Sequence, residues 1–205
     1  MTVIIDYDAG NLRSVQRACA EVGLDATITA DPSRVVRADR VIFPGVGAAG
    51  SAMKSLKANK LDEALLHVVA EGVPVLGICL GLQISLEFSE EDQTRTLGLI
   101  EGQVRRFDFA DPSLKVPHMG WNEVRKVRPH PLLAKLQPGD EFYFVHSYYP
   151  DPTERSQVYA ETDYERTFVS ALGHNNYFGT QFHPEKSGRV GLELLSCFAS
   201  WDGLV

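Results

Sequence analysis

Short apolar runs alternate with helical patterns through the first half of the chain, and this alternation restricts the fold more than any other feature. The apolar runs occupy residues 3–7, 41–43 and 73–78, and Pro44-Gly45 closes the second run. Strands that are apolar along their whole length are buried on both faces, and helices between them make such strands parallel. The first half therefore predicts βαβ units in an α/β fold, with helices on both faces of the sheet.

Apolar residues at helical spacing connect these runs. One helix follows Asn11, which can cap it, and ends at Gly23, a second ends at Gly72, and a third spans residues 80–88. The buried stripe of the first comprises Leu12, Val15, Cys19 and Val22, and that of the second comprises Leu61, Leu65, Val68 and Val69. A final helix carries Val190, Leu194, Cys197 and Phe198 on one side.

From about Gly98 onwards, strands follow one another without helices between them. The expected strands span residues 104–107, 122–127, 142–146, 158–161, 168–172 and 179–182. Short strands joined by turns are typical of an antiparallel or mixed region. No linker or repeat divides the chain, so we expect one domain over residues 1–205.

The charge balance excludes two classes of partner. The chain carries 27 acidic against 20 basic residues, a net charge of −7, whereas nucleic acid and anionic membranes bind basic faces. The most apolar stretch, residues 73–82, is too short to cross a bilayer, and no targeting signal is recognised at the start. Three scattered cysteines are too few for a disulfide framework or a zinc site. These features predict a cytoplasmic protein.

Cys79 is the best candidate for a nucleophile. It is the central residue of Gly-Ile-Cys-Leu-Gly at residues 77–81, between an apolar strand and a helical pattern. A nucleophile at a sharp strand-to-helix turn flanked by glycines forms an elbow, and the helix N-terminus favours a thiolate there. Cys19 and Cys197 lie on the apolar stripes of helices instead, so we interpret them as small buried hydrophobic residues.

A cysteine nucleophile needs a base, and the chain has six histidines. His67 lies off the apolar stripe of its helix, and His130 and His174 lie in expected turns. His118 and His146 lie at the ends of expected strands and remain alternatives.

The sequence His-Pro-Glu at residues 183–185 is the strongest candidate for the base and its orienting acid. Side chains two residues apart in an extended chain point to the same side, about 6–7 Å apart. The Glu185 carboxylate could therefore hold one imidazole nitrogen of His183 and leave the other facing the thiol. This is the logic of a nucleophile–base–acid triad.

A glycine-rich segment at residues 45–50 matches G-x-G-x-x-G, so a dinucleotide site has to be considered. The segment follows a later strand rather than the first, and the next strand ends at Cys79 where an acidic residue would be expected. We interpret it instead as a flexible backbone segment facing the nucleophile. A donor near Val46 or Gly47 would then complete an oxyanion hole with the N–H of Leu80.

Together these motifs resemble those of the class I glutamine amidotransferases, in the right order over essentially the whole chain. The matching pieces are residues 77–81 with Gln83, residues 45–47, His-Ser-Tyr at residues 146–148, and residues 183–185. The resemblance implies a flavodoxin-like three-layer α/β sandwich with a mostly parallel sheet and an antiparallel extension in its C-terminal half. It also implies hydrolysis of glutamine through a cysteine thioester, without a metal or cofactor.

Within that family, four segments are most similar to the glutaminase subunits of imidazole glycerol phosphate synthases. They are residues 5–7 with 10–12, Pro-Gly-Val-Gly at 44–47, Pro-His-Met-Gly-Trp-Asn at 117–122, and residues 183–187. This likeness implies a heterodimer with a (β/α)8-barrel cyclase that receives ammonia through an internal channel, in histidine biosynthesis. Asp8 and Ala9 in a variable turn, and Leu82 and Ser85 after the nucleophile, depart mildly from the pattern.

The resemblance also assigns roles to further residues. Those expected to contact glutamine are Gln83, Glu91, His146, Ser147 and Tyr148. Those expected to face the cyclase are Asn11, Trp121, Tyr143 and Lys186. Glu91 could instead be a solvated loop acid, and Trp121 and Tyr143 could be core residues.

Three alternatives to this function remain open from the sequence. The chain could serve another amidotransferase, in anthranilate, aminodeoxychorismate or pyridoxal phosphate synthesis. It could be a free-standing thiol hydrolase of γ-glutamyl compounds, which would be fully active alone. It could also be a non-catalytic interaction module, in which Cys79 would be inert.

Overall fold

A computed structural model describes residues 1–109 and 115–204 and has an eight-stranded sheet at its centre. Five neighbouring strands of this sheet run parallel, in the order β2 (Ala26–Thr29), β1 (Thr2–Ile5), β3 (Arg40–Gly45), β4 (Val75–Cys79) and β14 (Tyr177–Thr180). This is the order of a flavodoxin-like doubly wound sheet, with its fifth parallel strand supplied from near the end of the chain.

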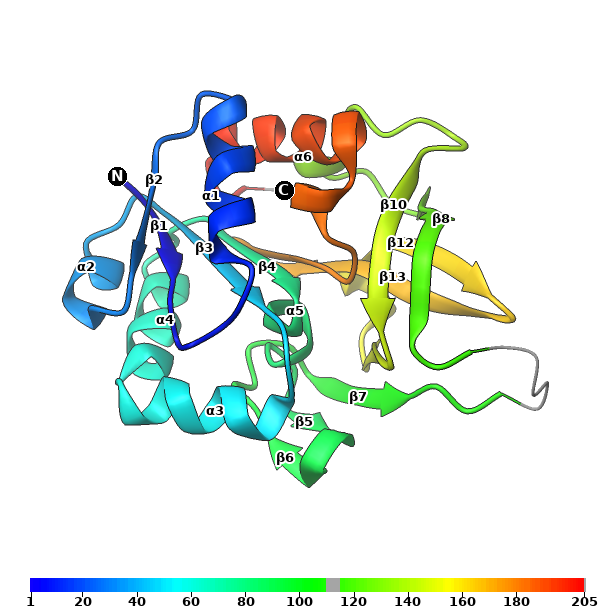
Figure 1. The fold of residues 1–205 in the computed structure, drawn as a ribbon, viewed down its shortest axis with the longest axis horizontal. Coiled ribbons are helices and arrows are strands. Elements are labelled where there is room, and N and C mark those ends of the chain that lie inside the picture. The colour runs from blue at the N-terminus through cyan, green and yellow to red at the C-terminus, as the bar shows by residue number, and fades with distance from the viewer. Residues whose placement is uncertain (110–114, 205) are drawn as a thin grey trace.

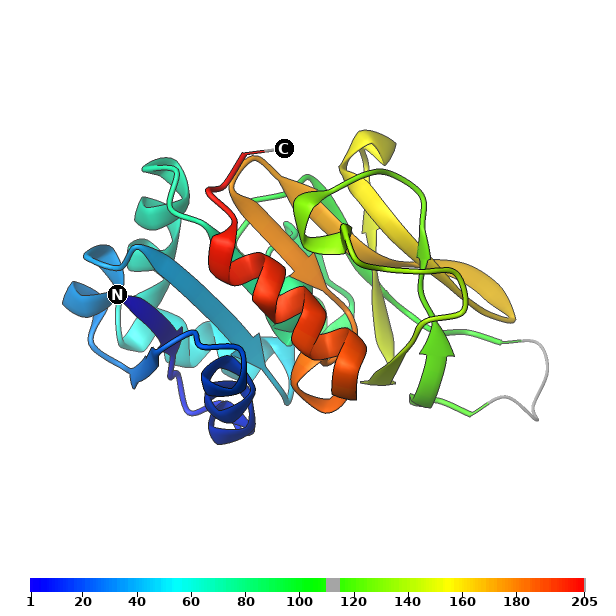
Figure 2. The same ribbon diagram turned by 90° about the horizontal axis from the view of Figure 1, so that it is seen from above.

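Helices cover both faces of the parallel strands (Figures 1 and 2). One layer contains α1 (Leu12–Glu21) and α6 (Gly188–Ser200), and the other contains α2 (Pro32–Val36), α3 (Ala49–Ala58) and α4 (Leu61–Ala70). Every residue of β1 and β4 is buried, as expected for strands covered on both faces. The α/β prediction from the first half of the sequence is confirmed.

The C-terminal half adds antiparallel structure to one side of the sheet. The strands that extend the main sheet are β13 (Arg166–His174), β12 (Val158–Tyr164) and β9 (Arg125–Lys126). One small sheet pairs β10 (Glu141–His146) with β8 (His118–Glu123). The other contains β11 (Tyr148–Pro152), β7 (Gly102–Arg106), β5 (Phe88–Ser89) and β6 (Thr94–Arg95). The predicted mixed region is therefore present.

The helix expected over residues 80–88 is wrong in length. The helix α5 (Leu80–Gln83) has a single turn, and the chain then continues towards β5. The carbonyl oxygen of Ile84, which would accept from Phe88 in a helix over residues 80–88, accepts instead from the N–H of Leu97 at 2.9 Å. The N–H of Glu87 donates to the carbonyl oxygen of Gly102 at 3.2 Å rather than to that of Gln83. These tertiary contacts replace helical hydrogen bonds, so the helix does not continue.

Over the described ranges, 1–109 and 115–204, no helix has both the length and the apolar character needed to cross a membrane.

Candidate active site

The predicted site residues follow the carboxyl ends of three adjacent parallel strands. Cys79 ends β4, the segment at residues 46–48 follows β3, and His183 lies three residues beyond β14. Ligands of open α/β sheets bind at this edge, because the loops that follow neighbouring strands meet there. A single pocket at this position is lined by Val46, Gly47, Cys79, Leu80, Gln83, Glu91, His146, Ser147, Tyr148 and His183, among others.

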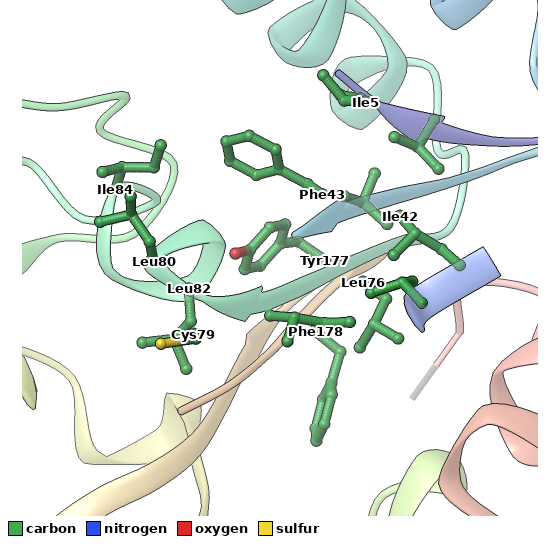
Figure 3. Packing of buried hydrophobic residues seen from close by; sticks show 14 of the residues in the cluster. Ile5, Ile42, Phe43, Leu76, Cys79, Leu80, Leu82, Ile84, Tyr177 and Phe178 are labelled. Atoms are coloured by element: carbon green, nitrogen blue, oxygen red, sulfur yellow. The ribbon is translucent and has the colours of Figure 1, made fainter. Parts of the chain in front are cut away.

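Cys79 forms a strained elbow between β4 and α5. Its backbone has φ 55° and ψ −104°, a combination that costs a non-glycine residue about 1–3 kcal/mol. The flanking glycines are required by close packing, since a Cβ on Gly77 would collide with the Tyr177 hydroxyl and one on Gly81 with the Phe43 carbonyl oxygen. Figure 3 shows Tyr177 and Phe43 packed beside this turn, with the Cys79 sulfur at its edge.

His183 and Glu185 form a buried pair, as the two-residue spacing predicts. The Nδ1 atom of His183 lies 2.8 Å from Oε1 of Glu185, and both side chains are almost fully buried. A carboxylate only accepts hydrogen bonds, so Nδ1 carries the proton. The Nε2 atom is buried and has no hydrogen-bond partner within the described part of the chain. That nitrogen is therefore available for proton transfer.

The charges around His183 favour its protonated form. Burial lowers the pKa of the imidazole, but the Cys79 sulfur and then the Glu185 carboxylate outweigh burial and raise this pKa to about 10. A protonated His183 beside a sulfur nucleophile can deliver a proton to a leaving group.

Asn11 has a different local role from the predicted cap. It lies in the left-handed region at φ 71°, and its side chain makes no cap hydrogen bond to α1. Instead its Nδ2 donates to Oε1 of Glu185 at 2.5 Å, the same oxygen that holds His183. The capping expectation is wrong because this tertiary partner takes the side chain. Asn11 and His183 thus hold the same carboxylate oxygen of Glu185.

The glycine-containing segment after β3 is exposed at residues 46–47, and it leads into a backbone N–H that bonds to Glu91, a predicted glutamine-binding residue. Val46 and Gly47 lie on the surface of the pocket, with Gly47 at φ 102°. Glu91 accepts a hydrogen bond from the N–H of Ala49, at the start of α3, over 2.8 Å. Burial raises the pKa of this carboxyl above its usual value. Glu91 is therefore a half-buried pocket residue, which favours the glutamine-binding role over that of a solvated loop acid.

Two alternative bases, His118 and His146, are tied to each other. Nδ1 of His118 lies 3.0 Å from Nε2 of His146. Nδ1 of His146 lies 2.8 Å from the carbonyl oxygen of Tyr148. Burial lowers the pKa of His118 to about 4 and that of His146 to about 3. Neutral imidazoles that are engaged in this way support the pocket wall at Tyr148, and among the described residues neither has a carboxylate partner of the kind that His183 has.

Gln181 belongs to the site but has no role in the sequence-based predictions. Its side chain is fully buried, and its Nε2 lies 3.7 Å from the Cys79 sulfur. The signal that could have identified it is its spacing, because Gln181 precedes His183 by two residues in an extended segment and so shares its side.

Three of the four residues expected to face a partner form a surface cluster. Trp121 is 54% exposed, and its ring lies across from that of Tyr143 at 6.1 Å between centroids. The ammonium nitrogen of Lys186 lies 5.7 Å from the centre of the Tyr143 ring. Core packing is therefore the wrong interpretation for Trp121, whereas Tyr143 is half-buried.

Known proteins share both the sequence and the fold. A chain from Desulfovibrio desulfuricans named imidazole glycerol phosphate synthase subunit HisH is 51% identical over 203 residues, covering 97% of this chain and 93% of that one. A chain of the same name from Nitrosococcus oceani is 48% identical, covering 98% and 97%. A solved structure, PurLQS from Thermotoga maritima, has a TM-score of 0.75 at 16% identity, covering 96% of each chain, so it supports the fold alone. The model of the family "Glutamine amidotransferase class-I" matches residues 3–199, and the chain belongs to that family.

Proposed function

We propose that the chain is the glutaminase subunit of an imidazole glycerol phosphate synthase. In this role it hydrolyses glutamine to glutamate and ammonia and passes the ammonia to a (β/α)8-barrel cyclase subunit, in histidine biosynthesis. The observation that carries the chemistry is the meeting of Cys79, the His183–Glu185 pair and Glu91 around one pocket. The identity of 48–51% with subunits of that name over nearly both whole chains supports the pathway.

The first half of the reaction forms a thioester. The Cys79 sulfur attacks the side-chain carbonyl carbon of glutamine, and the carbonyl oxygen becomes an oxyanion. The N–H of Leu80 opens α5 and has no partner within the helix, so it can donate to that oxyanion together with a donor at Val46 or Gly47. His183 then gives its Nε2 proton to the departing nitrogen, which leaves as ammonia.

The second half returns the enzyme to its resting state. His183, now neutral, takes a proton from water as the water oxygen attacks the thioester carbon. The C–S bond breaks, the sulfur leaves as a thiolate, and glutamate is released. Glu185, held by Asn11, keeps the imidazole in the tautomer that both steps require.

The pocket contains groups suited to the head group of glutamine. One oxygen of Glu91 accepts from Ala49, which leaves the other for the substrate ammonium. The Nε2 of Gln83 donates to the Tyr148 carbonyl at 2.8 Å, so its Oε1 is the atom that it can offer a ligand. Backbone groups of Ser147 and Tyr148 complete this side of the pocket.

We assign the cyclase-facing surface to the cluster of Trp121, Tyr143 and Lys186, with Asn11 close to the catalytic pair. The backbone of Tyr143 accepts from the N–H of His183 at 2.9 Å, so this surface is directly bonded to the segment that carries the base. A cytoplasmic location accompanies the proposal, because free cysteines without a disulfide, here Cys19, Cys79 and Cys197, are typical of a reducing compartment. The family match over residues 3–199 supports a single domain.

The test combines the chain with a candidate cyclase subunit and its phosphoribulosyl-formimino carboxamide nucleotide. We expect glutamine-dependent formation of imidazole glycerol phosphate only when both proteins are present. A Cys79→Ala variant should bind the cyclase but abolish the use of glutamine, while added ammonium salts still support the cyclase reaction. Transfer of ammonia to a synthase of another pathway instead would refute the pathway assignment. Full glutaminase activity without any partner would favour the free-standing hydrolase, and an inert Cys79 would favour the interaction module.

A further inference from the structure

The mechanism above makes no use of a fully buried amide that touches the nucleophile. Gln181 follows β14, and its Nε2 lies 3.7 Å from the sulfur of Cys79. Its Oε1 lies 3.1 Å from Nε2 of Gln83, and its backbone N–H donates to the carbonyl oxygen of Ser170 at 2.9 Å. The backbone bond fixes the segment, so the direction of the side chain is decided by its own two contacts.

The hydrogen-bond pattern determines which end of the Gln181 amide faces the sulfur. The carbonyl oxygen of Tyr148 can only accept, so Gln83 must present its NH2 group to it. The second hydrogen of that NH2 group points to Gln181, which must therefore present its carbonyl oxygen. Only the NH2 group of Gln181 is then left for the sulfur of Cys79.

We propose that Gln181 is a catalytic residue that supplies a second hydrogen-bond donor to the Cys79 sulfur, and that Gln83 is the positioning residue that keeps this donor turned towards it. A buried thiolate needs donors in place of water, and His183 has one N–H, at Nε2, to offer it because Nδ1 is held by Glu185. The Gln181 donor stabilises the thiolate before attack and again when the sulfur leaves the thioester carbon. The inference rests on Cys79 being the nucleophile of the proposed function, and it is independent of which partner receives the ammonia.

The competing explanation is that Gln181 only packs in the core and does not act on the sulfur. A pair of variants distinguishes this packing role from hydrogen-bond donation to Cys79. Gln181→Met has a similar length but no donor, so it removes the N–H···S contact. Gln181→Glu keeps the shape and the acceptor for Gln83 but places a carboxylate beside the sulfur. The other titratable groups around the sulfur, His183 and Tyr7, are the same in both variants.

The experiment measures the rate constant for alkylation of Cys79 by iodoacetamide against pH in the full chain, together with the kcat and KM of glutaminase turnover. A hydrogen bond to a charged group is worth about one to two pH units. In Gln181→Met, the pH at which the alkylation rate is half-maximal should therefore rise by about that amount. We expect at least the same shift in Gln181→Glu. In both variants kcat should fall by about 10- to 100-fold, with a smaller change in KM.

Asn176 provides a matched control at the other end of β14. Its buried amide donates to the carbonyl oxygen of Val73, away from the pocket. Asn176→Leu should lower the melting temperature but leave the pH dependence of Cys79 alkylation unchanged. If the Gln181 variants also lower the melting temperature without changing the pH dependence of Cys79 alkylation, Gln181 has only a packing role and the inference is wrong. If Gln181→Met does not fold, an unchanged alkylation profile in Gln181→Glu overturns the inference equally.

The wild-type chain separates this inference from the proposed function. Selective alkylation of Cys79 over Cys19 and Cys197 in the wild type, with profiles unaffected by the Gln181 variants, would refute only the role of Gln181. A wild-type Cys79 that reacts no faster than the other two thiols would refute the proposed function itself.

Discussion

Replacing His183 with Ala is expected to lower glutamine turnover by about 10⁴-fold or more. His183 takes part in every proton transfer of both half-reactions, and its Nε2 has no hydrogen-bond partner among the described residues, so it is free to face the nucleophile. Glu185→Ala should cost less, because the carboxylate orients and stabilises the imidazole without exchanging a proton with the substrate. The measurement is the rate of glutamate release by each purified variant in the presence of the cyclase.

His146→Ala is the matched control for this prediction. His146 is also a buried histidine that lines the pocket, but its ring nitrogens are engaged by His118 and by the Tyr148 carbonyl. We expect this variant to weaken glutamine binding through the wall at Tyr148 and to keep most of kcat. An active His183→Ala together with an inactive His146→Ala would show that the base has been assigned to the wrong residue.

The second large effect is a stimulation of glutaminase turnover of about 10²–10³-fold by the cyclase and its nucleotide. One missing oxyanion donor is worth about 2.7–4 kcal/mol, which corresponds to this change in rate. Ammonia released without an acceptor is wasted, so a coupled glutaminase gains from an incomplete oxyanion hole at rest. We infer that the Val46 carbonyl faces the nucleophile at rest and that the Val46–Gly47 N–H replaces it after activation.

The structure contains the means for such a rearrangement. Val46 and Gly47 are exposed at the pocket, and Gly47 already has φ 102°, which a residue with a side chain rarely adopts. Tyr143 joins the proposed cyclase-facing cluster to the His183 segment through a backbone hydrogen bond. The measurement compares glutamate release by the chain alone, with the cyclase, and with the cyclase and its nucleotide. Fast turnover by the isolated chain, unchanged by either addition, would contradict this account.

The elements that sequence reasoning located correctly are those with a local cause. The buried strands β1, β3 and β4 are short apolar runs, and the glycines that flank Cys79 predict the elbow there. The His183–Glu185 contact also follows from a two-residue spacing in an extended chain. Each of these features leaves a pattern within a few residues of sequence, so a single sequence is enough to predict it.

The features that were missed depend on partners far away in the sequence. The helix after Cys79 stops early because Leu97 and Gly102 bond to the Ile84 carbonyl and the Glu87 N–H, which a longer helix would use. The side-chain amide of Asn11 does not cap the helix that follows it but donates to the carboxylate of Glu185, 174 residues away. Gln181 is brought to the nucleophile by the pairing of β14 with β4, which joins the two halves of the chain. No local pattern records the first two contacts. The spacing of Gln181 and His183 places the two side chains on one side of the chain, but only the folded structure shows the contact of Gln181 with the sulfur.

The most direct test of the central claim, that Cys79 is the nucleophile that attacks glutamine, is mass spectrometry of the chain after brief exposure to an electrophilic glutamine analogue. Cys19 is fully buried, and burial raises the pKa of its thiol to about 12, while burial also raises the pKa of Cys197. Both should therefore stay unmodified. The account predicts a single adduct, on Cys79, whose formation is slowed by glutamine. Equal labelling of Cys19 or Cys197, or a Cys79 that remains unlabelled, would contradict it.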